Sequence, residues 1–309
     1  MGVEDTHTLS GGGTLPPGDY DLKLDSEIAG YRIKRKLGAG SMGTVYLAIQ
    51  LSLDRPVAIK ILNPNLAHNE EFARRFLREA KTVAKLNHPN VISGIDVGEQ
   101  DGIRYFVMEL VSGLTIRAIV ERGGPMDEGR VAHVALQVAR ALDHARQLNL
   151  VHRDVKPDNI IVTTDGVAKL CDLGLAKDRP DEGLSMGTPA YISPEQAKGQ
   201  SEVDIRSDLY SLGASMYHML AGKPPFDGTA QVVMTKHLNE IAVPLRQVDP
   251  DISGEMEATV TRLMEKQRVA RFQTPAELVL ALEAYQDKRR RRPMGASPVK
   301  RRPASRRRR

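Results

Sequence analysis

The chain has 309 residues, 41% of them apolar, and a formal net charge of +5. This length allows one large domain or two small ones. The single cysteine, Cys171, excludes an intramolecular disulfide, and no apolar run reaches the ~18 residues that a membrane span needs. The first residues also lack a secretory signal pattern. The sequence therefore predicts a soluble, cytoplasmic protein without a transmembrane span.

Charge is distributed unevenly along the chain. Residues 1–30 carry a charge of −5 and are rich in Gly, Pro, Asp and Thr, whereas residues 288–309 carry +12. Both segments lack apolar periodicity and are predicted to be disordered. The basic tail is either a solvated end or an electrostatic contact for nucleic acid or anionic lipid. It has no aromatic residues for base stacking, so its nucleic-acid binding would be non-specific.

The pattern after residue 30 is mainly that of strands. Runs typical of strands span residues 31–37, 44–50, 56–62 and 104–109. One helix interrupts them, because apolar residues recur there at steps of three and four. Its predicted inner face consists of Phe72, Phe76, Glu79, Val83 and Leu86. An acid on such a face is costly unless it is paired, so Glu79 either binds a cation or lies at a solvated rim.

Beyond residue 113 the periodicity becomes helical. One predicted helical stripe consists of Val131, Val134, Val138, Leu142, Ala145 and Leu148. Thr274 to Glu277 read as a capping box with proline at the first helical position of the last helix. The expected fold is α+β and bilobal, with a small β-rich N-lobe (31–110) and a larger, mostly helical C-lobe (111–287).

A glycine-rich turn joins the first two predicted strands. The segment Gly38-Ala39-Gly40-Ser41-Met42-Gly43 has the G-x-G-x-x-G spacing, which lets backbone N–H groups approach phosphates. A dinucleotide-binding loop would need a helix next, and a Walker A loop would need Gly-Lys-Ser/Thr. Neither follows. A plain glycine-rich hairpin remains the alternative, and a surface role is likewise the alternative for Lys60 at the end of its strand.

Two further segments carry the chemistry. They are Val151-His152-Arg153-Asp154-Val155-Lys156-Pro157-Asp158-Asn159 and Asp172-Leu173-Gly174. Together with the glycine turn and Lys60, they resemble the motifs of the eukaryotic-type (Hanks-type) serine/threonine protein kinase family in that family's order and spacing. The resemblance covers residues 31–287 and implies the bilobal protein-kinase fold. Tyr210 and the segment from Tyr191 to Gln196 make it most similar to bacterial members.

The resemblance implies a set of catalytic roles with ATP and Mg²⁺ as cofactors. Lys60 would hold the ATP phosphates and pair with Glu79, while Asp154 would accept the proton of the substrate hydroxyl. Lys156 would stabilise the transferring phosphoryl group. Asn159 and Asp172 would coordinate Mg²⁺, which prefers oxygen ligands. The implied nucleotide-binding residues are Gly38, Ala39, Gly40, Ser41, Gly43, Val45, Ala58, Lys60, Met108, Glu109, Val111 and Ile161.

Serine/threonine specificity is implied by Lys156 and by the segment Gly187 to Tyr191, in which Thr188 would contact Asp154. The expected function is phosphoryl transfer from ATP to Ser or Thr hydroxyls of protein substrates, with autophosphorylation. The alternatives are a catalytically silent pseudokinase scaffold and a kinase for small molecules. The complete catalytic set argues against the scaffold, and the peptide-docking segment argues against the small-molecule kinase.

Other positions are expected to support the fold or its regulation. The resemblance implies that Glu195 pairs with Arg271 and that Asp208 braces the catalytic loop. Leu173 replaces a common phenylalanine and can fill the same apolar slot. Ser185 is either a phosphosite facing Arg153 or a solvated loop residue.

Substrate selection is signalled only faintly by the sequence. Asp158 would favour a basic residue before the target, but His218 stands where many kinases with that preference have a second acid. Cys171 is expected to be a small buried hydrophobe rather than a redox sensor.

Overall fold

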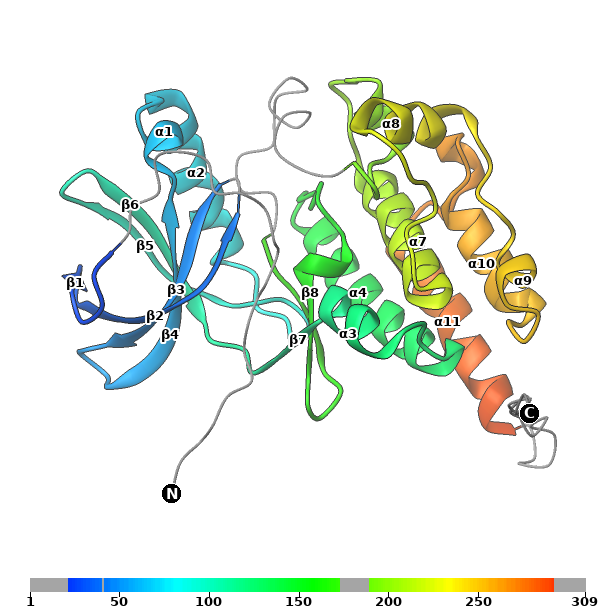
Figure 1. The fold of residues 1–309 in the computed structure, drawn as a ribbon, viewed down its shortest axis with the longest axis horizontal. Coiled ribbons are helices and arrows are strands. Elements are labelled where there is room, and N and C mark those ends of the chain that lie inside the picture. The colour runs from blue at the N-terminus through cyan, green and yellow to red at the C-terminus, as the bar shows by residue number, and fades with distance from the viewer. Residues whose placement is uncertain (1–21, 41, 173–188, 292–309) are drawn as a thin grey trace, which may run out of the picture.

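The structure, a computed structural model, describes residues 22–40, 42–172 and 189–291. Figure 1 shows two lobes, one built mainly of strands β1–β6 with α1 and α2, and the other mainly of helices. A small sheet lies where the lobes meet. None of the helices in the described part has the length and apolar character needed to cross a bilayer.

The first sheet contains six antiparallel strands in the order β1-β2-β3-β4-β6-β5. The strands are β1 (Glu27–Ile28), β2 (Tyr31–Gly40), β3 (Gly43–Gln50), β4 (Arg55–Leu62), β5 (Gly94–Gln100) and β6 (Ile103–Glu109). The four predicted strands are confirmed, and β1 and β5 are additions. None of the residues of β5 is fully buried, so no apolar run marks this strand in the sequence.

Strand β4 is buried on both faces, and its successive side chains point alternately to one face and the other. Ile59 and Ile61 pack in an outer apolar cluster with Tyr46 and Val107. The intervening residues point the other way, toward the cluster shared with α2 (Glu70–Val83) and the second lobe. Lys60 is one of these inward residues, which explains why only 5% of it is exposed.

The helix predicted after β4 is confirmed as α2, preceded by the short α1 (Pro64–Ala67). Phe72, Phe76 and Val83 are buried on its inner face. The side chain of Glu79 lies outside the described atoms. The expected partner of that acid therefore stays a prediction.

The second sheet consists of β7 (Gly113–Thr115), β8 (Ile160–Thr163) and β9 (Ala168–Leu170). It is tied to the first lobe because the Leu170 backbone exchanges hydrogen bonds with Asn90 and Ile92, at 2.9 and 3.0 Å. Residues just before β8 and just after β9 are thereby brought to the junction of the lobes.

Helices account for most of the remaining described residues of the second lobe. They are α3 (Ile116–Gly123), α4 (Glu128–Gln147), α6 (Pro194–Ala197), α7 (Ile205–Ala221), α8 (Ala230–Asn239), α9 (Leu245–Val248), α10 (Gly254–Leu263) and α11 (Pro275–Arg291), with 3₁₀ turns η1 (Pro157–Asn159) and η2 (Arg268–Ala270). Helix α7 is buried from Ser207 to Leu220 and forms the centre of the lobe. The stripe predicted on α4 is buried except for Leu148, which lies past the helix end and is 44% exposed.

Two boundaries differ from the sequence prediction. Residues 22–30 were expected to be disordered, but Glu27–Ile28 pair with β2 and Ile28 is buried. The tail was expected to lose structure at residue 288, but α11 continues to Arg291. The continuation is stabilised because Lys288 pairs with Glu255 at 2.8 Å and Arg289 with Glu128 at 2.6 Å. The remaining tail residues lie outside the described part.

The contact between α7 and α10 depends on a missing side chain. A Cβ at Gly213 would lie 2.6 Å from the Leu263 Cβ. We expect Gly213→Ala to lower the free energy of unfolding by about 1–2 kcal/mol, because overpacking outweighs the gain in helix propensity. Gly123→Ala, where nothing lies within 4 Å, is the control and should be neutral or slightly stabilising. Urea titration measures the stability of both variants. Equal midpoints for Gly213→Ala and the wild type would show that the α7–α10 contact accommodates the added methyl group.

Candidate functional site

The catalytic loop begins with a turn after α4 that is held by α7. The Asp208 carboxylate accepts the backbone N–H groups of His152 and Arg153, each at 2.7 Å. Burial raises the pKa of Asp208 to about 7, and the two N–H donors oppose that shift. Arg153 has a φ of 65°, an uncommon value for a residue other than glycine. The predicted bracing role of Asp208 is confirmed, and it stabilises a strained turn.

His152 connects this turn to the segment after β9. Its Nε2 lies 2.9 Å from the Cys171 carbonyl oxygen, and its Nδ1 accepts the Asp154 N–H at 3.2 Å. These partners correspond to a neutral ring with the proton on Nε2. One fully buried histidine thus orients both Asp154 and the residue preceding Asp172.

Asp154 lies within a group of polar side chains from its own loop. Its Oδ2 accepts a hydrogen bond from Asn159 Nδ2 at 3.0 Å and lies 2.9 Å from Lys156 Nζ. Burial opposes the charge of Lys156, yet the carboxylates of Asp154, Asp158 and Asp172 raise its pKa above the ordinary value. The three predicted residues are therefore adjacent, with Lys156 as a cation.

Lys60 reaches across from the first lobe to Asp172. Its Nζ lies 2.8 Å from Asp172 Oδ1. Burial alone would raise the pKa of Asp172, but the Lys60 cation lowers it below the usual value, so the carboxylate is ionised at neutral pH. Asp172 also has a positive φ of 57°. An anion and a cation from different lobes thus meet at a strained backbone position.

The oxygen donors of Asn159 and Asp172 fit a small hard cation. The Cys171 N–H donates to the Asn159 carbonyl at 2.9 Å, which connects the two backbone segments. Asn159 uses its Nδ2 to bind Asp154, so its amide oxygen is the atom left for a metal. No group of three or more His, Cys, Asp or Glu side chains within residues 22–40, 42–172 and 189–291 could hold a metal. Mg²⁺ commonly takes one or two protein ligands and completes its shell with phosphates and water, so the donor set fits.

A pocket opens beside the connection between the lobes. It is lined by Arg35, Leu37, Leu47, Leu110, Val111, Ser112, Gly113, Leu114, Thr115, Ala118 and Ile161. Of the predicted nucleotide-binding residues, Val111 and Ile161 are among these. The leucines were missed by the sequence analysis, although Leu37 directly precedes the glycine turn.

The other predicted apolar contacts belong to the same core as the pocket wall. Ala58 pairs with Met108 across β4 and β6, and Val45 pairs with Lys60 across β3 and β4. Glu109 donates its backbone N–H to Ser93 at 3.0 Å, so only its carbonyl can serve a ligand. Its carboxylate is used structurally, accepting Lys169 Nζ at 2.7 Å.

The glycine turn forms the tip of the β2–β3 hairpin. Gly38 lies opposite Val45, and Gly40 lies opposite Gly43. Gly43 has a φ of 152°, and a Cβ there would collide with the Ile61 carbonyl, so only glycine fits. Ala39 is paired with Thr44, and Ser41 lies outside the described residues.

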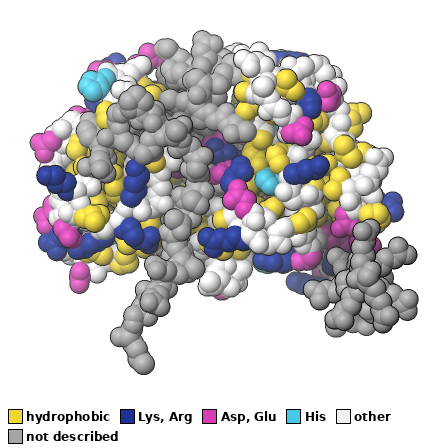
Figure 2. All heavy atoms as spheres, in the orientation of Figure 1, with side chains coloured by type: hydrophobic (Ala, Val, Ile, Leu, Met, Phe, Trp, Pro, Cys, Tyr) yellow, Lys and Arg dark blue, Asp and Glu magenta, His cyan; other side chains and the backbone are white. Residues whose placement is uncertain are grey.

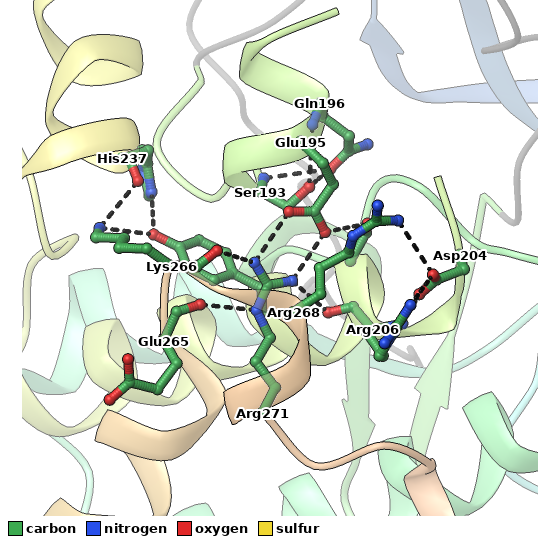
Figure 3. A network of polar contacts seen from close by, with 12 residues as sticks. Ser193, Glu195, Gln196, Asp204, Arg206, His237, Glu265, Lys266, Arg268 and Arg271 are labelled. Atoms are coloured by element: carbon green, nitrogen blue, oxygen red, sulfur yellow. Dashed lines mark hydrogen bonds and ion pairs between the residues drawn. The ribbon is translucent and has the colours of Figure 1, made fainter. Parts of the chain in front are cut away.

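A buried ion pair anchors the segment from Pro189 to α6 in the second lobe. Figure 3 shows Arg271 facing Glu195, with two hydrogen bonds of 2.8 and 2.9 Å between their side chains. Arg271 is 0% exposed at its side chain and Glu195 is 3% exposed. Burial disfavours the Glu195 charge, but hydrogen bonds from Arg271 hold its pKa below the ordinary value. The predicted pairing is confirmed.

Neighbouring residues extend this anchor in both directions. Gln196 Nε2 donates to the Arg153 carbonyl at 2.9 Å, which joins α6 to the catalytic loop. On the other side, Lys266 Nζ lies 2.9 Å from the His237 carbonyl and 5.7 Å from the centre of the Tyr210 ring. Burial lowers the pKa of Lys266 to about 8. Tyr210 is fully buried, so it contributes to this structural cluster rather than to a ligand site.

Several predicted residues are not covered by the described part of the chain. These are Leu173, Gly174, Ser185, Gly187 and Thr188. Cys171 is only partly buried and packs against the main apolar cluster, and desolvation raises the pKa of its thiol, which disfavours the reactive thiolate. That shift supports its interpretation as a packing residue.

These features together define a two-lobed enzyme fold with a ligand pocket at the lobe junction and a charged cluster beside it. Figure 2 shows basic and acidic side chains side by side at the middle of this face, where the lobes meet. The protein kinase domain model matches residues 31–281, and the chain belongs to that family.

Similar proteins agree with this assignment. A probable serine/threonine-protein kinase of Clostridium perfringens is 41% identical over 259 residues, which cover 82% of this chain and 38% of that protein. The PknI kinase domain of Mycobacterium tuberculosis superposes with a TM-score of 0.71 at 31% identity, covering 85% of this chain and 98% of that one. Rad53, solved in complex with AMP-PNP, gives 0.70 at 27% identity, covering 83% and 65%. The chain spans about two-fifths of the length of the first curated relative.

Breaking the buried anchor should be costly. Arg271→Met strands the Glu195 charge and leaves the carbonyls of Arg206, Glu265 and Lys266 without their donor. We expect a loss of about 3–5 kcal/mol in the free energy of unfolding.

Glu195→Gln should also destabilise, and the double variant should lose less than the sum of the two. Lys288→Ala, which removes an exposed ion pair, is the control and should cost under about 1 kcal/mol. Denaturant titrations decide the matter; additive losses would show that the two side chains act independently.

Buried histidines should make the fold sensitive to acid. Burial lowers the pKa of His237 to about 4, whereas an unfolded histidine titrates near 6.5. Between these values only the unfolded state takes up the proton, so stability falls as pH falls. From pH 7 to 5 the wild type should lose about 2 kcal/mol more than His237→Gln loses.

His68→Gln, at an exposed histidine, is the control and should leave the wild-type loss unchanged. Unfolding free energies at the two pH values provide the measurement. Parallel pH profiles for His237→Gln and the wild type would contradict the assignment.

Proposed function

We propose that this chain is a serine/threonine protein kinase that transfers the γ-phosphate of ATP to hydroxyl groups of proteins. The observation that carries the proposal is the convergence of Lys60, Asp154, Lys156, Asn159 and Asp172 at the lobe junction. Phosphoryl transfer depends mainly on alignment and charge neutralisation, and this cluster supplies both.

Each group has a role that its contacts support. Asp154, oriented by Asn159, receives the proton of the attacking hydroxyl, and Lys156 neutralises charge on the transferring group. Lys60 contacts the ATP phosphates, with Glu79 as its expected carboxylate partner. Thr188 is expected to contact Asp154 from the segment that docks the peptide. The hydrophobic pocket would take the adenine, with backbone groups of Glu109 and Val111 as hydrogen-bonding partners.

Mg²⁺ held by Asn159 and Asp172 would neutralise phosphate charge. The protein residues prepare that site by presenting one carboxylate and one amide oxygen from connected backbone segments. The complex of the similar protein Rad53 with AMP-PNP supports a nucleotide in this fold.

The wider context of the activity is also part of the proposal. We propose that the substrates are proteins and that the chain acts in the cytoplasm. Residues 31–287 would constitute the kinase domain. The basic residues of the tail would contribute only non-specific electrostatic binding to nucleic acid or anionic lipid. The alternative, a silent scaffold, has no favouring observation, because every described catalytic side chain is of the required type.

The decisive experiment measures transfer of labelled phosphate from ATP with Mg²⁺ to the chain itself and to a generic basic protein. We expect label on serine or threonine and a decrease of at least about 100-fold for Asp154→Asn. Asp251→Asn, an exposed carboxylate on the same lobe, should retain wild-type transfer. Label on tyrosine, or equal transfer by Asp154→Asn and the wild type, would refute the proposed mechanism.

A further inference from the structure

An arginine of helix α3 contacts the catalytic loop. Arg117 Nε lies 2.5 Å from Asp158 Oδ1, and the two elements α3 and η1 pack together. Asp158 is four residues after Asp154, in the turn that ends at Asn159. The pair is about one-third exposed on each side, at 29% and 36%. It therefore borders the catalytic cluster and is accessible to a molecule bound there.

The same arginine also contacts Tyr191, which lies in the segment before α6. Arg117 Nη2 lies 3.4 Å from the Tyr191 hydroxyl, which in turn lies 2.6 Å from His218 Nδ1. Burial and the neighbouring Arg117 cation lower the pKa of His218 to about 4, so this imidazole is uncharged at neutral pH. The Tyr191 and His218 rings are stacked at 5.9 Å. Arg117 thus contacts both the Asp158 carboxylate and a stacked tyrosine–histidine pair in which the histidine is uncharged.

This arrangement changes the role expected for Asp158. An exposed carboxylate beside Asp154 would attract a basic residue of a substrate, as the sequence predicts for Asp158. Here the carboxylate already has a guanidinium partner, and the neighbouring His218 adds no negative charge to attract a second cation. Glu121, at 3.8 Å from Arg117, holds the arginine from the outer side. A substrate arginine would have to compete with a cation of the protein itself.

We propose that Arg117 occupies the Asp158 subsite in place of a substrate arginine, so that the chain does not select basic residues there. The proposal rests on the proposed kinase function. An intramolecular partner acts at an effective concentration of millimolar order or above, which a peptide side chain at micromolar concentration cannot match. Arg117 is a specificity-determining residue in this sense, because it acts by closing a site for cations.

The test uses serine peptides in which arginine is placed, one position at a time, at each position before the target. For the wild type we expect kcat/KM to change less than about threefold at every position. Arg117→Ala should raise kcat/KM for arginine at one position by about tenfold relative to the neutral peptide, because the carboxylate gains a new partner. Arg122→Ala removes an exposed cation of the same helix and should behave as the wild type.

Two further variants keep the outcome unambiguous. Arg117→Ala combined with Asp158→Asn should lose the acquired preference, since its acceptor is gone. Asp158→Asn alone should leave the arginine-to-neutral ratio of the wild type unchanged, whatever its effect on rate. A tenfold fall in that ratio would overturn the proposal, and so would Arg117→Ala, if folded, without any new preference. Absence of transfer to every peptide by the wild type would instead count against the kinase function.

Discussion

The two hydrogen bonds that Asp208 accepts from the backbone of the catalytic loop determine much of the rest of the site. Asp208 belongs to a helix that is buried along most of its length, so these bonds fix the loop to the core of the second lobe. Because Arg153 adopts a left-handed backbone conformation, the turn would not keep this shape unaided. With the turn fixed, His152 can contact both Asp154 and the Cys171 carbonyl. The positions of Asp154 and Asp172 thus depend on one buried carboxylate, that of Asp208.

Charge compensation organises the remaining polar groups. Three ion pairs show this: Lys60 with Asp172, Lys156 with Asp154, and Arg271 with Glu195. The members of the first and third pairs lie far apart in sequence, and those of the second lie within one turn. A buried charge is costly without such a partner, so the pairs constrain how the lobes and loops approach one another. The network in Figure 3 extends this constraint from Glu195 to α7 and to the residues that follow α10. Its Gln196 also reaches the catalytic loop, which joins the two regions physically.

Much of this architecture could be predicted from local patterns. The alternation along β4 and the stripe on α2 identified buried faces, and ordered motifs identified Asp154, Asn159 and Asp172. The Glu195–Arg271 pair could be named only through the family resemblance, since 76 residues separate its members. The edge strands β1 and β5 have little apolar burial and left no such pattern. The extension of α11 depends on ion pairs with Glu128 and Glu255, which sequence spacing cannot reveal. Arg117 was missed for the same reason, because nothing local distinguishes it from a solvated helical arginine.

The site therefore contains acids whose roles differ although their residue type and neighbourhood are alike. Asp154 and Asp158 lie in one short loop, and each has a cationic partner at close distance. The partner of Asp154 is Lys156, a residue of the same loop beside the proposed position of phosphoryl transfer, so that pair remains close to reacting groups. The partner of Asp158 comes from α3, and it is further tied to Tyr191 and Glu121. A carboxylate held in this way is engaged before any substrate arrives. The motif alone specifies which acids are present, whereas the tertiary partners determine which of them can still interact with a ligand.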